Sequence, residues 1–282
     1  MKDLADAGIH LILIDIIGMG SSSRPEFDKE QTAEQADEYF VGFLENWRKA
    51  FGDLKDFYLA GHSFGGYVCG NYAIKYPQYI KKLLMLSPVG VCKKPDNYDF
   101  STNKSTFASI VRSAWKNKWS PFGILRNSGS LIGNSLIKKY ISRRMKDSLS
   151  PEEQQDMLKY MHQIFMREGS TEYAIFICFE IGLWALNPLE SETRLGNPDI
   201  AIPISFYYGD SDWMDHRGGR RVVDKNIFKY SNEATEDKGM SQVHIINESD
   251  HHLYLDNPKE LAGLMIADIF QAEEFFSSKH KA

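Results

Sequence analysis

One serine lies in a glycine-rich string, LAGHSFGG, in which Gly61, Ser63 and Gly65 form G-x-S-x-G. The string follows an apolar run at 57–60 and precedes a helical pattern, so we expect a strand, a sharp turn and a helix. A serine on such a turn stands at the end of a sheet, where only small neighbours avoid collision. The helix N-terminus behind it would stabilise negative charge on an acyl oxygen. The pattern predicts a nucleophilic serine on a turn, or nucleophile elbow, with an oxyanion-binding backbone N–H; these residues are Gly61, His62, Ser63, Phe64 (the N–H donor), Gly65 and Gly66.

A nucleophilic serine needs a general base, and the base needs an acid to orient it. Asp212 lies three residues after Gly209, just past the apolar run at 204–208, and His251 lies a few residues past the run at 243–246. This chain order of serine, acid and histidine is the one expected after a strand–turn–helix nucleophile. We therefore predict a triad of Ser63, Asp212 and His251. The alternatives are Asp210 or Asp215 as the acid and His252 as the base.

His251 and Asp256 also form H-x-x-x-x-D, the spacing found in glycerolipid acyltransferases. In those enzymes the aspartate orients the histidine, which activates a lipid hydroxyl. The chemistry alone favours the alternative that Asp256 and Asn257 cap the final helix. We expect His62 to pack or hydrogen-bond beside the serine, and His216 to lie at the surface.

The elements that must position these residues are short apolar runs alternating with helical patterns, which indicate an α/β fold with a mostly parallel sheet. The predicted strands are 9–14, 57–60, 83–86, 204–208 and 243–246, and the helices flanking them are 31–50, 65–76 and 258–275. Residues 89–197 interrupt the alternation with a long, mostly helical block. We predict a helical cap at 89–197, inserted between two parts of one core, 1–88 and 198–282.

Composition excludes several classes of protein. The net charge of −5 does not suit nucleic-acid binding, which requires a basic surface. Three scattered cysteines are too few for a disulfide framework or a zinc site. No apolar run reaches the roughly 20 residues needed to span a bilayer. These features predict a cytoplasmic protein, and nothing in the sequence requires a metal or cofactor.

The cap contains a basic amphipathic segment at 131–146. Its apolar positions could share one side, with basic residues beside them; they are Leu131, Leu136, Ile137, Ile141 and Met145, and Lys138, Lys139, Arg143 and Arg144. Two interpretations stay open: docking on an anionic membrane or lipid-droplet surface, or a cap helix with a solvated charged face.

Several longer strings resemble one subfamily of the α/β-hydrolases. They are DIIGMGSSSRPEF, GHSFGGYVCGNYAIKYPQYIKKLLMLSPVGV and DHHLYLDNP, with SPFGILRNSG, GSTEYAI and GLWALNPLE in the cap. That subfamily contains the lysophospholipase acting on N-acyl-phosphatidylethanolamine and the lipid-droplet coactivator of adipose triglyceride lipase. The resemblance implies a lipid substrate, such as a glycerophospholipid or lysophospholipid. The coactivator lacks the serine, whereas this sequence keeps Ser63.

The resemblance also implies acyl transfer toward lysophosphatidic acid as a variant of hydrolysis, because both reactions share an acyl-enzyme. The other interpretations are a small-molecule esterase or aminopeptidase on the same fold, and a non-catalytic scaffold that binds lipid droplets and a lipase. The family begins with further strands and a His-Gly-rich loop that donates a second oxyanion N–H. We therefore expect this sequence to be an N-terminally incomplete version of a longer protein.

Overall fold

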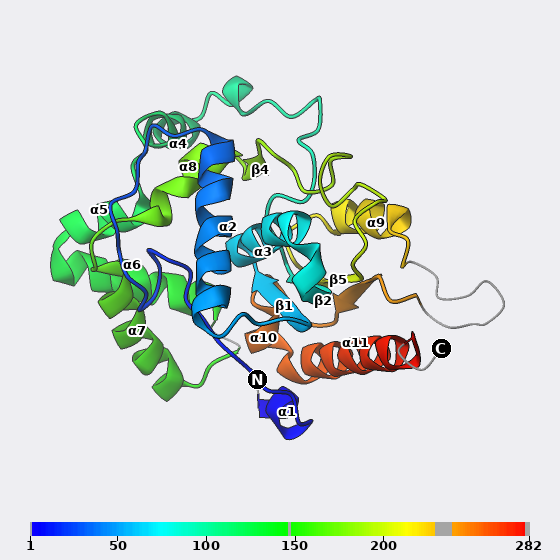
Figure 1. Cartoon of the computed structure of the whole chain (residues 1–282). Helices are drawn as coiled ribbons and strands as arrows, with labels where there is room; N and C mark the ends of the chain where they lie inside the picture. The colour runs from blue at the N-terminus through cyan, green and yellow to red at the C-terminus, as the bar shows by residue number, and fades with distance from the viewer. Residues whose placement is uncertain (1, 146–147, 229–238, 280–282) are drawn as a thin grey trace. The chain divides into compact units, whose positions relative to one another are not determined.

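The computed structural model describes residues 2–145, 148–228 and 239–279. The chain forms two compact units, whose elements are labelled in Figure 1. The first unit comprises Met1–Leu13, Asp37–Lys94 and Trp184–Ala282, and the second comprises Ile14–Ala36 and Pro95–Leu183. All residues predicted to do chemistry belong to the first unit.

The first unit is built on a four-stranded parallel sheet in the order β1-β2-β5-β6. The strands are β1 (Phe57–His62), β2 (Ile80–Leu86), β5 (Ile204–Gly209) and β6 (Gln242–Ile246). The four strands predicted in these regions are confirmed, and the fold class is α/β. The central strands β2 and β5 are buried along almost their whole length, as expected for parallel strands with both faces covered. Ser63, Asp212 and His251 all follow carboxyl ends of strands, so parallel pairing brings them to one edge of the sheet.

Helices cover both faces of this sheet. Those of the first unit are α1 (Lys2–Asp6), α3 (Phe64–Lys75), α9 (His216–Lys225), α10 (Leu253–Asp256) and α11 (Pro258–Lys279), with a 3-10 turn η1 (Pro77–Tyr79), while α2 (Ala33–Ala50) runs from the second unit into the first. The helices predicted at 31–50, 65–76 and 258–275 are confirmed. Figure 1 places α3 and α9 on one side of the sheet and α11 on the other.

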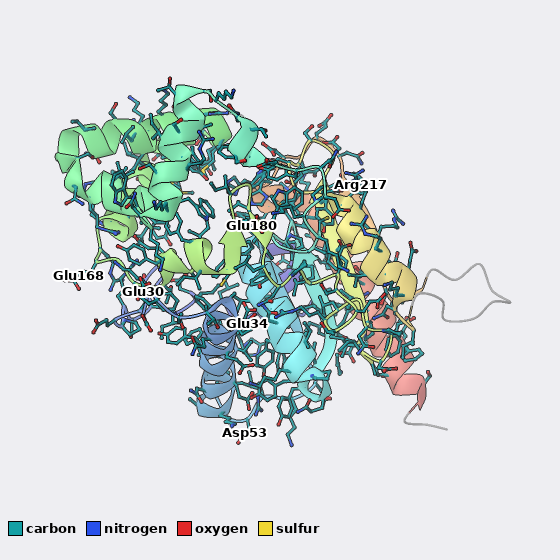
Figure 2. All side chains as sticks on the ribbon, turned by 90° about the horizontal axis from the view of Figure 1, so that it is seen from above. Glu30, Glu34, Asp53, Glu168, Glu180 and Arg217 are labelled. Carbon is teal, nitrogen blue, oxygen red and sulfur yellow. The ribbon has the colours of Figure 1, made fainter. Side chains whose placement is uncertain are left out.

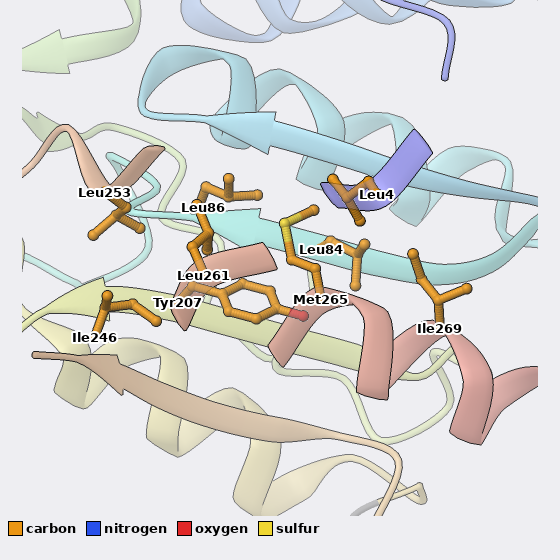
Figure 3. Packing of buried hydrophobic residues seen from close by; sticks show 9 residues of the cluster. All are labelled: Leu4, Leu84, Leu86, Tyr207, Ile246, Leu253, Leu261, Met265 and Ile269. Atoms are coloured by element: carbon orange, nitrogen blue, oxygen red, sulfur yellow. The ribbon is translucent and has the colours of Figure 1, made fainter. Parts of the chain in front are cut away.

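An apolar cluster fills the space between the sheet and α11 (Figure 3). Its buried members are Leu4, Leu84, Leu86, Tyr207, Ile246, Leu253, Leu261, Met265 and Ile269. Because side chains alternate along a strand, Leu84 and Leu86 face α11 whereas Leu83 and Met85 point to the opposite face. Each large apolar side chain buried here stabilises the fold by roughly 1.5–3 kcal/mol. The cluster therefore anchors α11 and the strand ends that carry the predicted catalytic residues.

A buried ion pair lies within this layer. Lys82 of β2 and Asp268 of α11 are 2.7 Å apart, and their side chains are 0% and 2% exposed. Asp268 also accepts a hydrogen bond from the Tyr207 hydroxyl and another, at 3.0 Å, from Nε2 of His244. The carboxylate thus compensates the ammonium group where water cannot.

The strand predicted at 9–14 is wrong. The segment has no regular secondary structure, and within the described residues no strand pairs with the free side of β1. Ile9 and Leu11 pack against the apolar cluster, whereas Leu13 is 72% exposed. An apolar run forms a strand only where another strand completes its hydrogen bonds, and the segment lacks that partner here.

The second unit is mostly helical, and the cap predicted at 89–197 stays a prediction. Its helices are α4 (Thr106–Lys116), α5 (Pro121–Asn127), α6 (Gly129–Arg144), α7 (Pro151–Phe165) and α8 (Ile175–Cys178), with 3-10 turns η2 (Phe100–Thr102) and η3 (Thr171–Ala174). A two-residue strand, β3 (Phe179–Glu180), follows α8, whereas β4 (Trp184–Ala185) belongs to the first unit. Serine side chains cap three of the helices; Ser150 and Glu153 form a full capping box at the start of α7.

The segment 14–36 joins the helices of this unit through main-chain hydrogen bonds. The Arg24 guanidinium donates to the carbonyls of Gly18 and Ile164, and the Thr171 hydroxyl donates to the Ile17 carbonyl at 2.6 Å. Charged side chains such as Glu30 and Glu168 stand exposed on the unit (Figure 2). The sequence pattern did not predict this association, because hydrogen bonds to carbonyls leave no periodic signal.

Candidate active site

Ser63 occupies the predicted turn between β1 and α3. Its backbone has φ 53° and ψ −119°, a conformation that non-glycine residues seldom adopt. The Ser63 N–H donates to the carbonyl of Leu86 at 3.0 Å, and the Ser63 carbonyl accepts from the N–H groups of Tyr67 and Val89 at 3.2 Å each. These bonds hold the strained turn against the end of β2.

Close packing explains the glycines around this turn. A Cβ on Gly61 would lie 2.4 Å from the carbonyl oxygen of Gly65, and a Cβ on Gly66 would lie 2.8 Å from Cβ of Pro88. Both positions therefore exclude any larger residue. Phe64 is the first residue of α3, so its N–H lies at the positively polarised end of that helix.

The His251 ring contacts Ser63. Its Nε2 lies 3.0 Å from the Ser63 Oγ, within hydrogen-bond distance, and its side chain is only 11% exposed. The ring reaches this position from the loop between β6 and α10, residues 247–252, which we call the histidine loop. Asp210 holds the backbone of this loop. That carboxylate accepts from the N–H groups of Glu248 and Ser249, at 2.9 and 3.1 Å.

Asp212 lies on the other side of the ring. Its Oδ1 is 3.3 Å from Nδ1 of His251 and accepts from the N–H of Met214 at 3.0 Å. The side chain is fully buried. Burial alone would raise the pKa of Asp212, but the hydrogen bonds from His251, Ser87 and Met214 outweigh it, so the pKa lies below its usual value. Asp212 is therefore a carboxylate at neutral pH, as a group that orients a histidine must be.

The alternative acids, Asp210 and Asp215, and the alternative base, His252, have other hydrogen-bond or ion-pair partners. Asp210 bonds to the backbone of the histidine loop, as described above, and Asp215 caps α9 and pairs with Arg217. Figure 2 labels Arg217 on that helix. His252 has its Nδ1 3.1 Å from the Tyr254 hydroxyl, and His216 is exposed at the start of α9. Of the three aspartates, the structure brings Asp212 to the His251 ring.

Asp256 bonds to the backbone of the histidine loop rather than to the ring. Its Oδ2 accepts from the N–H of Asp250 at 3.0 Å. Asn257 caps α11, since its Oδ1 accepts from the N–H of Glu260 at 3.3 Å. A role for Asp256 in acyl transfer stays a prediction, and in this structure the carboxylate acts on the loop that carries His251.

His62 supports the same loop. Its Nε2 lies 2.8 Å from the His251 carbonyl oxygen, which can only accept, so the proton of the neutral ring is on Nε2. Burial, with the nearby His251, lowers the pKa of His62 to about 4. The ring is therefore neutral at physiological pH and ties the histidine loop to the elbow.

Ser87 is a site residue that the sequence pattern missed. It follows β2 directly, its residue is 0% exposed, and its Oγ contacts both Asp212 Oδ2 and His251 Nδ1, the latter at 2.6 Å. A single serine after an apolar run carries no motif, so only its place at the strand end could have drawn attention to it.

Among the described residues, no cluster of three or more His, Cys, Asp or Glu side chains is arranged to hold a metal ion. No described helix combines the length and apolarity needed to cross a bilayer.

Comparison with known proteins now places the fold. A profile described as the alpha/beta hydrolase fold matches residues 1–258. The chain belongs to the alpha/beta hydrolase family. A solved bromoperoxidase from Bacillus anthracis has a similar fold, with a TM-score of 0.63, 18% identity, and coverage of 95% of this chain and 84% of its own.

Two relatives have names that refer to reactions on lipids. A probable 1-acylglycerol-3-phosphate O-acyltransferase from Oryza sativa is 27% identical, covering 91% of this chain and 59% of its own. The human (lyso)-N-acylphosphatidylethanolamine lipase is 29% identical, covering 86% of this chain and 66% of its own. These similarities confirm the predicted family resemblance. The chain spans about three fifths of the length of the first relatives it matches.

Proposed function

We propose that this hydrolase-family chain is a serine hydrolase acting on acyl esters of lysophospholipids or related glycerolipids. The contact of Ser63 Oγ with His251 Nε2, at 3.0 Å, carries the proposal because it joins a nucleophile to a base. The names of the relatives support a lipid substrate.

The mechanism follows from the contacts. Ser63 Oγ attacks the acyl carbon while His251 Nε2 takes its proton, and the carboxylate of Asp212 stabilises the imidazolium that forms. The N–H of Phe64 donates to the oxyanion of the tetrahedral intermediate. His251 then protonates the leaving alcohol, and an acyl-serine remains.

Water attacking that acyl-serine gives hydrolysis, and a lipid hydroxyl attacking it gives acyl transfer. Transfer is the second candidate, favoured by the acyltransferase relatives. In either reaction the incoming oxygen gives its proton to His251, so the same triad serves both.

Substrate class is tested by comparing purified protein on lysophosphatidylethanolamine and on p-nitrophenyl butyrate. We expect kcat/KM for fatty-acid release from the lipid to exceed that for the short ester by about 10-fold or more, because burial of a long acyl chain contributes binding energy to the transition state. Adding lysophosphatidic acid as an acceptor separates transfer from hydrolysis by the product formed. Faster turnover of the short ester would instead indicate a small-molecule esterase.

Contact with a membrane is proposed through one face of α6. Of the apolar residues that the docking interpretation would place on a membrane, Ile137, Ile141 and Met145 are buried, at 2%, 2% and 4% exposure, because this side of α6 packs within the unit. The side chain of Leu131 and residue Lys146 lie outside the described part.

The exposed face of α6 instead carries Ile132, Leu136 and Tyr140, and Lys139 and Arg143 lie along the same stripe. Interleaved apolar and basic side chains suit an anionic lipid surface.

Removing the two charges tests this contact. We expect Lys139→Ala/Arg143→Ala to weaken binding to vesicles containing phosphatidylserine by about 30-fold, since each basic residue near such a surface contributes about 1 kcal/mol. The measurement is co-sedimentation with phosphatidylserine-containing and pure phosphatidylcholine vesicles. The control replaces two exposed lysines on other helices, Lys159→Ala/Lys225→Ala. Equal loss in both double variants would show that binding depends on overall charge and not on α6.

A further inference from the structure

Ser87 occupies a position between Asp212 and His251, the acid and the base of the predicted triad. Its Oγ lies 2.6 Å from Nδ1 of His251 and hydrogen-bonds to Oδ2 of Asp212. The direct approach of Asp212 Oδ1 to the same Nδ1 is longer, at 3.3 Å. The shorter connection between acid and base therefore runs through a hydroxyl group.

Counting protons fixes the direction of these hydrogen bonds. If Nε2 of His251 is to take the proton of Ser63, it must be unprotonated at rest, so the neutral ring carries its proton on Nδ1. That N–H must then donate, and Ser87 Oγ accepts it. The only proton on the Ser87 hydroxyl is left to donate to Asp212, whose carboxylate can only accept. The result is one chain, Nδ1–H to Oγ–H to Oδ2.

The backbone holds Ser87 in this place. The Ser87 N–H donates to the Tyr207 carbonyl at 2.7 Å, and its φ of 40° is one that non-glycine residues seldom adopt. With 0% exposure, Ser87 cannot reach a substrate, whereas Ser63 is partly exposed. Of the two serines in contact with the His251 ring, Ser63 can be the nucleophile and Ser87 cannot.

We propose that Ser87 is a positioning residue that holds His251 in the Nδ1–H tautomer and links its ring to Asp212. The hydroxyl accepts from the ring and donates to the carboxylate, so it fixes the ring plane and transmits the negative charge of Asp212 to the imidazolium. This role rests on the proposed function, because it requires His251 to act as the base for Ser63. No bond is made to Ser87 during turnover, and no proton needs to leave it.

The test compares Ser87→Ala with Ser205→Ala. Ser205 is equally buried, at 0% exposure, but lies within β5, opposite Leu84. With p-nitrophenyl butyrate we expect Ser87→Ala to lower kcat by about 10- to 100-fold, the effect of losing one hydrogen bond to a charged group, with little change in KM. Ser205→Ala should keep its kcat within about threefold of the wild-type value, since a neutral hydroxyl remote from the ring contributes little to the transition state. The Nδ1–H proton resonance of His251 should move upfield in Ser87→Ala and stay in place in Ser205→Ala.

A double variant separates positioning from a merely structural role. If Ser87 acts through the link to Asp212, then Ser87→Ala/Asp212→Asn should have a kcat within about threefold of Asp212→Asn alone, because residues of one unit are not additive. Multiplied losses, an unmoved resonance, or a Ser87→Ala kcat close to the wild-type value would overturn the proposal. Failure of the proposed function is distinct: the wild-type protein itself would show no turnover that depends on Ser63.

Discussion

Replacing Ser63 by alanine is expected to lower kcat for ester hydrolysis by about 10⁴-fold or more, because the covalent route through an acyl-serine is lost. KM should change little, since the alanine removes one oxygen at the turn and no binding group. The unusual backbone of Ser63, with φ 53°, is retained by other bonds, from its N–H to Leu86 and from Tyr67 and Val89 to its carbonyl. The fold should therefore survive the change.

A fluorophosphonate probe, which reacts with an activated serine hydroxyl, tests the proposed nucleophile without a substrate. The wild-type protein should be labelled on the peptide that contains Ser63, and the Ser63→Ala variant should not be labelled. His251→Ala should be labelled far more slowly, because the base 3.0 Å from the Oγ is gone. Absence of label on the wild-type protein would favour the non-catalytic scaffold, and label on another residue would contradict the assignment of Ser63.

The proximity of Ser63 and His251, the proposed nucleophile and base, could be predicted because their signals are local. The string around Ser63 combines small residues with a strand and a helix, and His251 follows the last strand. The acid was harder, since Asp210, Asp212 and Asp215 lie within six residues of one another. Which of them reaches the ring depends on how the loop after β5 turns, and spacing alone does not determine that. Ser87 depends on the same kind of tertiary contact and has no motif at all.

The sequence of a strand or helix likewise does not reveal which other elements pack against it. The apolar run at 9–14 matches the pattern of the confirmed strand at 83–86, but only the second lies between two other strands. In α6 the periodicity correctly indicated a helix with apolar positions. It could not tell whether these positions pack inside the unit or dock on a lipid surface, and the structure buries Ile137, Ile141 and Met145. Periodicity gives the type of element, and packing decides which face is covered.

The largest effect on stability is expected at the buried pair of Lys82 and Asp268. Asp268→Asn keeps the shape of the side chain but leaves the ammonium of Lys82, with 0% side-chain exposure, without a compensating charge. Breaking such a pair costs about 3–5 kcal/mol, a large share of the roughly 5–15 kcal/mol by which domains are stable. Urea unfolding at pH 7 measures the loss.

The pH dependence of this stability follows from the carboxylate. Burial alone would raise the pKa of Asp268, but the hydrogen bond from His244 and the charge of Lys82 lower it to about 2, from an ordinary 3.8. A pKa depressed in the folded state means that the ionised group stabilises the fold above about pH 4 and that this contribution is lost as the pH falls toward 2. The difference corresponds to about 2 kcal/mol at neutral pH. In Asp268→Asn this part of the acid sensitivity should disappear.

Two further variants decide whether charge compensation is the cause. Burial lowers the pKa of Lys82 despite the neighbouring carboxylate, so the attraction to Asp268 offsets only part of the desolvation cost of the charged lysine. Lys82→Met in the Asp268→Asn background should therefore restore most of the lost free energy of unfolding.

The matched control is Glu273→Gln, which breaks an ion pair between the same two elements, β2 and α11. In that pair Lys81 lies 2.8 Å from Glu273, and the two side chains are 24% and 44% exposed. That change should cost less than about 1 kcal/mol. Equal losses at Asp268 and Glu273, or no recovery in the double variant, would mean that packing around α11 and not the unpaired charge sets the stability.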